Sequence, residues 1–362
     1  MPENITYDLS LENTHIRDIN ELPFPLEIKE ATPATPNSIA TVLAGRTAVE
    51  NTLATSSTRE KLLVVTGPCS VNDPKSALEY AEWIKQKRDQ YGDELEIMMR
   101  MYFEKPRTTV GWKGLINDPN LDESFDINTG LRTARQLAVD ITDKGVPVGT
   151  EILDNMTPQY FGGLISWGAI GARTVESQPH RELASGLSFP IGFKNGTGGN
   201  VQFAVDAVSA AAHPHRFLAI TDEGTAAIAS TSGNPHGHII LRGGSTGPNY
   251  STTDIASATE KLAKKDLSPI VMIDSSHANS GKDHTKQIEV VQEVARQITG
   301  GSTAIMGVMI ESNLKAGAQP FSPGSKHEYG LSITDACVDL DTTNAMLEIL
   351  ANSIQKRKTL NN

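Results

Sequence analysis

The sequence lacks several features that define whole classes of protein. Its 362 residues contain two cysteines, too few for a disulfide framework. No stretch approaches the roughly 20 apolar residues of a membrane span. The first residues, MPENITYDLS, lack the basic and apolar regions of a secretory signal. Positive charge is in the minority, and the net charge of −11 argues against nucleic acid as a partner. These absences favour a cytoplasmic protein that binds neither membranes nor nucleic acid.

Length and composition are typical of a globular enzyme. The chain exceeds a minimal eight-stranded (β/α)₈ barrel and has room for one such barrel plus an extension. Hydrophobic residues make up 38% and charged residues 21%, without a biased tract, which indicates a packed core. A basic cluster inside so acidic a chain would focus its field on a small anion.

Eight short apolar runs each end at or just before a charged or metal-binding side chain. Buried parallel strands read as continuous apolar runs, and catalytic groups gather at their carboxyl ends in a (β/α)₈ TIM barrel. The sequence therefore predicts this fold and a site at one end of it. The expected strands are Leu62–Thr66, Leu95–Met101, Val146–Glu151, Ala169–Arg173, Pro190–Lys194, His238–Arg242, Pro269–Asp274 and Ala304–Ile310.

Helical segments alternate with these runs, as βαβ units require. We expect helices near Pro74–Tyr91, Asn128–Lys144, Val201–His213, Thr253–Lys265, Thr285–Thr299 and Thr342–Lys356. The segment Phe217–Ser230 breaks the pattern, because its two β-like runs are separated by four residues, too few for a helical crossover. We interpret it as a β-hairpin inserted before the sixth strand.

Residues 1–58 differ from the catalytic domain that we expect over residues 59–362. Tyr7–Leu11 has a β-like pattern, prolines at 23, 25, 33 and 36 break the chain, and Ser38–Ala54 has helical spacing. We interpret this part as an N-terminal extension. It is either a packed arm or an oligomerisation and regulatory element.

One group of strand-end residues has the chemistry of a metal site. Cys69 follows the first run, His277 the seventh, and Glu311 ends the eighth, with Asp335 beyond it. One sulfur, one nitrogen and two oxygen donors suit Mn, Fe, Co or Zn better than Mg or Ca. Each residue taken alone is more often an ordinary core or surface residue, so this interpretation depends on their meeting at one barrel end.

A second group is cationic. Arginine offers a rigid donor fork for phosphate or carboxylate, and lysine offers a point charge. Each cation taken alone is usually a solvated surface charge, but these close buried runs. Six converging cations would repel one another without an anion, so the cluster indicates phosphorylated substrates. Its members are Arg100, Lys105, Arg107, Arg173, Lys194 and Arg242.

Long motifs carry a family resemblance beyond this pattern. GPCS at 67–70, KPRTTVGWKGLINDP at 105–119, GFKNGT at 192–197, SHANS at 276–280 and SITDAC at 332–337 resemble the type I, amino-acid-regulated 3-deoxy-D-arabino-heptulosonate 7-phosphate (DAHP) synthases. The match runs in order from about Arg17 to Lys356. It implies a transferase that condenses phosphoenolpyruvate with erythrose 4-phosphate in the first step of the shikimate pathway.

The resemblance also implies roles for individual residues. Cys69, His277, Glu311 and Asp335 match the ligands of one divalent metal ion per subunit (Mn, Fe, Co or Zn), and no organic cofactor is expected. The phosphoenolpyruvate site matches Arg100, Lys105, Arg173, Lys194 and Arg242, and the erythrose 4-phosphate site matches Arg107 and Thr108. Glu151 and Lys194, with Lys105, match the catalytic groups.

Regulation is a further implication. A feedback site for an aromatic amino acid matches Asp154, Pro158, Leu183, Leu187, Ser188, Phe217 and Ala219, two of which lie on the expected hairpin. The small residue at 219 favours tyrosine over phenylalanine as the effector. The resemblance implies a homodimer or homotetramer.

Two alternatives remain open at this point. One is a related synthase that joins phosphoenolpyruvate to a different sugar. The other is a non-catalytic regulator that binds an aromatic amino acid on the same fold. The KPRTT motif and the hairpin favour the DAHP synthase over the first alternative, and the intact ligand and cation positions argue against the second.

Overall fold

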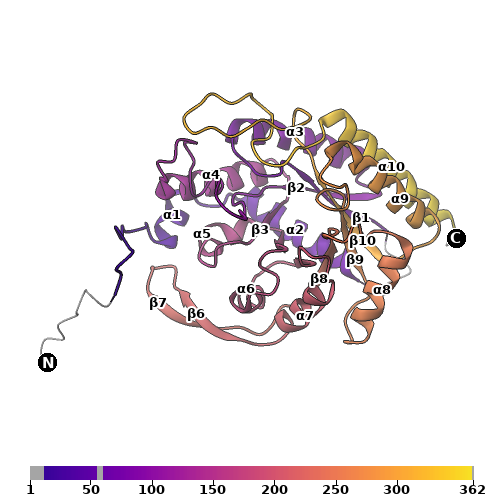
Figure 1. The fold of residues 1–362 in the computed structure, drawn as a ribbon, viewed down its shortest axis with the longest axis horizontal. Coiled ribbons are helices and arrows are strands. Elements are labelled where there is room, and N and C mark those ends of the chain that lie inside the picture. The colour runs from indigo at the N-terminus through magenta and orange to yellow at the C-terminus, as the bar shows by residue number, and fades with distance from the viewer. Residues whose placement is uncertain (1–11, 55–59, 361–362) are drawn as a thin grey trace, which may run out of the picture.

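A closed barrel of eight parallel strands forms the centre of the molecule (Figure 1). The computed structural model describes residues 12–54 and 60–360, so the β-like segment expected at Tyr7–Leu11 lies outside it. Around the barrel the strand order is β1-β10-β9-β8-β5-β4-β3-β2. The strands are β1 Leu62–Gly67, β2 Leu95–Arg100, β3 Val148–Glu151, β4 Trp167–Ile170, β5 Ile191–Lys194, β8 Gly237–Leu241, β9 Val271–Asp274 and β10 Ile305–Glu311.

The TIM-barrel prediction is confirmed, and the strand ends differ from expectation by a few residues. The largest difference is in β4, which runs from Trp167 to Ile170 rather than from Ala169 to Arg173, and both β3 and β9 start two residues later than expected. Arg173 thus lies in the loop after its strand. This loop places the Arg173 side chain beyond the end of the sheet, where it can contact a ligand.

Helices surround the barrel, and the six longer ones lie close to their expected ranges. They are α3 Pro74–Tyr91, α4 Ile127–Asp143, α7 Gln202–Ala211, α8 Thr252–Ala263, α9 Gln287–Thr299 (preceded by the 3₁₀ turn η2, His284–Lys286) and α10 Leu340–Leu360. Three short elements were not expected from the sequence: α5 Pro158–Phe161, the 3₁₀ turn η1 Gly162–Leu164 and α6 Gln178–Ala184. These are too short to show a helical period. Of the described helices, none is long and apolar enough to cross a membrane.

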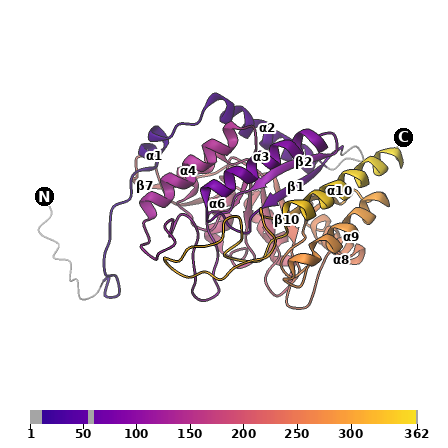
Figure 2. The ribbon, with the colours of Figure 1, turned by 90° about the horizontal axis from the view of Figure 1, so that it is seen from above.

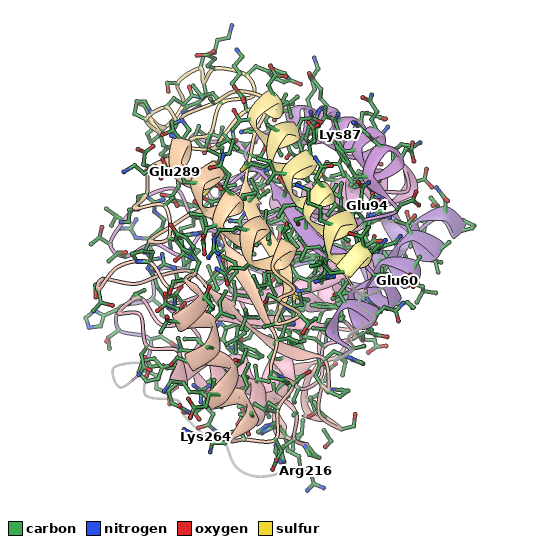
Figure 3. All side chains as sticks on the ribbon, turned by 90° about the vertical axis from the view of Figure 1, so that its right-hand side faces the viewer. Glu60, Lys87, Glu94, Arg216, Lys264 and Glu289 are labelled. Carbon is green, nitrogen blue, oxygen red and sulfur yellow. The ribbon has the colours of Figure 1, made fainter. Side chains whose placement is uncertain are left out.

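Both faces of the strands are buried, which explains their continuous apolar sequence. In β1, Leu62 and Val64 pack against the helices, while Leu63 and Val65 belong to the cluster inside the barrel. Large side chains such as Trp167 fill that interior. On the outer surface, α9 and α10 run side by side, with Glu289 on α9 and Lys87 on the neighbouring α3 (Figure 3).

Two helices precede the barrel, α1 Pro25–Ala31 and α2 Pro36–Leu53. Helix α2 confirms the helix expected at Ser38–Ala54, α1 was not expected, and two of the four prolines do not break the chain. Pro25 and Pro36 open the helices, because the first helical position needs no backbone N–H donor. Helix α2 lies at the upper edge of the molecule in Figure 2, across one end of the barrel, and its Val49 belongs to the cluster inside the barrel. It packs against the amino ends of the strands, where Gly45 is so close that a Cβ would lie 2.7 Å from Pro147.

The inserted hairpin is confirmed. Strands β6 Arg216–Ile220 and β7 Ala226–Ser230 pair antiparallel as a separate two-stranded sheet at the edge of the molecule (Figure 1). The alternation of a β-strand turns Leu218 outwards, where it is 89% exposed. Phe217 and Ala219 face the other way, towards α5 and α6. The division of the chain at residue 58 stays a prediction.

Candidate active site

A cavity of about 290 Å³ lies at the carboxyl ends of the barrel strands. All eight strands are parallel and end on the same side, so residues far apart in the sequence meet there. Its lining contains nearly every residue that sequence analysis assigned to catalysis, substrate or metal: Arg100, Lys105, Arg107, Thr108, Glu151, Arg173, Lys194, Arg242, His277, Glu311 and Asp335. Cys69, the remaining one, is fully buried beside it.

Three of the four expected metal ligands form a tight cluster. Donor atoms of Cys69, Glu311 and Asp335 all lie within 4.8 Å of one another. The fourth, His277, joins at the edge, with Nε2 3.7 Å from Glu311 Oε1. Burial, and after it the charge of Glu311, raises the pKa of the Cys69 thiol to about 11. A thiol, an imidazole and two carboxylates fit a borderline divalent ion, so the chemistry of the donor set agrees with the metal interpretation.

Two buried cations hold this cluster together. Lys105 Nζ lies 2.6 Å from Cys69 Sγ and 2.9 Å from Asp335 Oδ2. The Arg100 guanidinium donates to Glu311 Oε1 at 3.0 Å and to the carbonyl oxygen of Cys69 at 3.0 Å, and lies 3.5 Å over the Tyr102 ring. Arg100 therefore fixes two expected metal ligands as well as lining the cavity.

Glu151 brings an unpartnered carboxylate oxygen to the cavity. Its side chain is buried, and Oε1 has no hydrogen-bond partner among the described residues. Gly171 leaves room for this carboxylate, because a Cβ there would lie 2.2 Å from Oε1 and displace it. A buried acceptor without a protein partner is suited to holding a water or a substrate hydroxyl.

The remaining cations surround the open side of the cavity. Arg173 donates to Thr108 Oγ1 at 3.0 Å, which ties the end of β4 to the KPRTT loop. Lys282 also lines the cavity, and sequence analysis missed it. It lies in a turn of the loop after β9, away from the strand end, and no sequence signal marks it. Seven cations and three carboxylates line the cavity, which favours phosphorylated ligands.

Asp274 is a second residue that sequence analysis missed. It ends β9, is fully buried, and lies 3.0 Å from Lys194 Nζ and 2.9 Å from His277 Nδ1. Burial raises the pKa of Asp274, but the charges of His277 and Lys194 outweigh it and hold the pKa well below its ordinary value. The strand-end rule could have found Asp274, because it closes its own apolar run.

A second cavity, of about 990 Å³, lies under the hairpin beside α5 and α6. Its lining brings together six of the seven expected effector residues: Pro158, Leu183, Leu187, Ser188, Phe217 and Ala219. Asp154 is not among the lining residues. Its carboxylate instead accepts from the backbone N–H groups of Met156 and Thr157, at the turn that leads into α5.

Glu104 lies between the two cavities. It directly precedes Lys105, and Thr157 Oγ1, from the turn before α5, donates to Glu104 Oε2 at 3.1 Å. The side chain is buried and has no ion-pair partner among the described residues. Burial, followed by the charge of Asp154, raises the pKa of Glu104 to about 7.

Replacing Glu104 by glutamine is therefore expected to stabilise the protein at alkaline pH. A carboxyl whose folded-state pKa is raised contributes its stability below the unfolded pKa of about 4.5, and loses it as pH rises through about 7. The shift corresponds to about 3 kcal/mol. Glu104→Gln should raise the melting temperature at pH 8.5 and leave it unchanged at pH 4.5. The exposed Glu60→Gln serves as control, and an equal gain at both pH values would contradict the prediction.

Fold and site together define a TIM-barrel enzyme whose anion-binding active site adjoins a cluster of metal-type ligands. The sequence model of the DAHP synthetase I family matches residues 46–348. The chain belongs to this family, which confirms the resemblance drawn from the motifs.

Individual relatives are similar over nearly the whole chain. The phospho-2-dehydro-3-deoxyheptonate aldolase, Phe-sensitive, of Escherichia coli K12 is 54% identical over 347 residues, which are 96% of this chain and 98% of that protein. The tyrosine-inhibited aldolase of Schizosaccharomyces pombe is 48% identical over 363 residues, 99% of this chain and 97% of that one. A solved structure of the Francisella tularensis SCHU S4 aldolase has a TM-score of 0.92 at 51% identity, covering 94% of this chain and 99% of its own.

Proposed function

We propose that the protein condenses phosphoenolpyruvate with erythrose 4-phosphate and water to give DAHP and inorganic phosphate, the first step of the shikimate pathway. The observation that carries this proposal is the meeting of a cation-lined cavity with the cluster of Cys69, Glu311 and Asp335 at one barrel end. Membership of the DAHP synthetase I family supports it.

In this proposal the cations hold two phosphorylated substrates side by side. Lys105, Arg173, Lys194 and Arg242, with Arg100 behind them, bind the phosphate and carboxylate of phosphoenolpyruvate. Arg107 and Thr108 bind the phosphate of erythrose 4-phosphate, and the bond from Arg173 to Thr108 joins the two subsites. Holding both anions in register turns an encounter of two molecules into a reaction between positioned groups.

The chemistry requires an electrophilic aldehyde and an activated water. Cys69, His277, Glu311 and Asp335 would hold one divalent ion, Mn, Fe, Co or Zn, which when bound supplies Lewis-acid polarisation of the aldehyde carbonyl. Carbon 3 of phosphoenolpyruvate attacks the aldehyde, and carbon 2 takes up water. Glu151 accepts one proton of that water through its free oxygen, and Lys194 donates a proton to the oxygen of the attacked aldehyde, which becomes a hydroxyl. The hemiketal phosphate then loses inorganic phosphate.

A phosphate-release assay on metal-stripped protein tests this function. Activity should return with a divalent ion and require erythrose 4-phosphate. Release with arabinose 5-phosphate or an N-acyl hexosamine instead would indicate a related synthase. A protein that binds an aromatic amino acid but never releases phosphate would be the non-catalytic regulator.

We also propose that the 990 Å³ cavity binds an inhibitory aromatic amino acid. Lys29 of α1 lines it and pairs with Asp222 of the hairpin turn at 2.6 Å. This contact supports a regulatory role for the extension of residues 1–58. Exposed Leu218 and Ile228 on the hairpin support a homodimer or homotetramer, which light scattering would determine.

Tyrosine is expected to inhibit at lower concentration than phenylalanine, because the small Ala219 leaves room for a hydroxyl. Ala219→Val fills that space, and overpacking of about 1–3 kcal/mol should weaken tyrosine inhibition about 10-fold or more. Ala226→Val, on the exposed face of the same hairpin, is the matched control. Inhibition curves for both amino acids check this, and stronger inhibition by phenylalanine would overturn the choice of tyrosine.

A further inference from the structure

One buried carboxylate connects the expected metal cluster to the substrate cations. Asp274 Oδ2 lies 2.9 Å from His277 Nδ1 and 3.0 Å from Lys194 Nζ. These are ion contacts rather than aligned hydrogen bonds. The other oxygen, Oδ1, accepts from the backbone N–H of Ser276 at 3.0 Å, and Asn279 donates to the Asp274 carbonyl at 2.8 Å. The carboxylate is thus held from behind and presents one oxygen to two functional side chains.

The position of this carboxylate decides which nitrogen of His277 faces the ligand cluster. With Nδ1 next to Asp274, Nε2 is turned to Glu311, 3.7 Å away. A proton on Nδ1 is favoured by the neighbouring carboxylate, which leaves the Nε2 lone pair for a cation. The backbone of His277 has a φ of +56°, a conformation that residues other than glycine rarely adopt. Backbone strain at a cavity residue is typical of a functional position, and here it helps to set the orientation of the imidazole ring.

The same oxygen fixes Lys194. The Lys194 side chain is 4% exposed, and Asp274 is the carboxylate within 4.0 Å of its ammonium among the described residues. Without that partner, the lysine would be a buried charge lacking compensation, and it would have to move or recruit another anion.

We propose that Asp274 is a positioning residue that sets the Nε2 atom of His277 towards the metal-type cluster and holds the Lys194 ammonium at the cavity. This inference rests on the proposed function where it is tested with phosphoenolpyruvate, but not where it is tested by metal binding alone. Asp274 is placed to contact neither the metal nor the substrates. It acts through His277 of the expected metal ligands and through Lys194 of the substrate-binding cations.

Replacing Asp274 by asparagine tests the metal half on the whole chain without any substrate. Co(II) affinity of the metal-free variant, measured by competition with a chromophoric chelator, should be about 10–100-fold weaker than in the native protein. The thiolate-to-Co(II) band from Cys69 should persist at saturation, while the ligand-field bands shift because His277 is no longer held. Glu104→Gln removes another buried carboxylate that contacts neither His277 nor Lys194, and it should bind Co(II) as the native protein does.

Native Co(II) affinity in a folded Asp274→Asn protein would overturn the metal half. For the lysine half, the KM for phosphoenolpyruvate should rise about 10-fold, which corresponds to the loss of one hydrogen bond from the displaced Lys194 ammonium to the substrate. An unchanged KM alongside weakened Co(II) binding would remove Lys194 from the proposal.

If Asp274→Asn fails to fold, the native protein decides the question. Histidine ¹⁵N spectra of the metal-free chain, assigned with His277→Gln, report the tautomer of the neutral ring. A proton on Nδ1 supports the proposal, and a proton on Nε2 overturns it. The native protein could also show the Nδ1 proton, and Asp274→Asn the weakened Co(II) binding, while no synthase activity is found. That outcome would count against the proposed function and leave this inference standing.

Discussion

Replacing Cys69 by serine is expected to reduce kcat by about 1000-fold or more. The substitution removes the sulfur donor of the cluster and leaves a hydroxyl that binds borderline divalent ions weakly. Lewis-acid stabilisation is worth several kcal/mol, which sets the size of the effect. The measurements are phosphate release at saturating substrates and the affinity of the metal-free protein for Co(II), which should fall in parallel.

The chain supplies a matched control for this change. Cys337 is the second buried cysteine, and its sulfur accepts a hydrogen bond from the Cys69 backbone N–H at 3.4 Å. Cys337→Ser makes the same replacement next to the site without touching the donor set. It should keep native Co(II) affinity and most of the activity. Equal losses in the two variants would show that packing, not ligation, accounts for the Cys69 effect.

Replacing Arg100 by methionine is expected to destabilise the fold by about 3–5 kcal/mol as well as to abolish activity. Arg100 and Glu311 form an ion pair in which the side chains are 1% and 0% exposed. Removing one partner leaves a carboxylate without this compensation in the barrel. Arg100 also donates to the carbonyl oxygens of Pro68 and Cys69, so the loop that carries Cys69 loses its anchor. Urea unfolding curves measure the loss.

Arg88→Met is the control that shows how much stability is lost when an ion pair nearer the surface is removed. Arg88 pairs with Glu96 at 2.7 Å, but its side chain is partly exposed. Pairs at the surface contribute about 0–1 kcal/mol. A destabilisation of Arg100→Met no larger than that of Arg88→Met would contradict the role given to the buried pair.

The sequence was informative wherever a residue closes an apolar run. Glu151, Lys194 and Glu311 end strands, and the parallel barrel brings their side chains to one cavity. Prediction failed where a contact depends on segments that are distant in the sequence. Lys282 reaches the cavity from a turn and leaves no local pattern. Asp154 is a different case. The resemblance places it in the effector cavity, but its carboxylate makes a short-range contact, accepting from the backbone N–H groups of Met156 and Thr157.

The sequence by itself determined the barrel, the inserted hairpin and the family, because apolar runs, short gaps and long motifs are local properties of the chain. Only the tertiary structure decided how the groups act on one another. Gly171 leaves space for the Glu151 carboxylate, and Asp274 stands between His277 and Lys194. His277 is only three residues from Asp274, but the contacts of Glu151 with Gly171 and of Asp274 with Lys194 join different strands within a few ångströms, and no spacing along one strand encodes them.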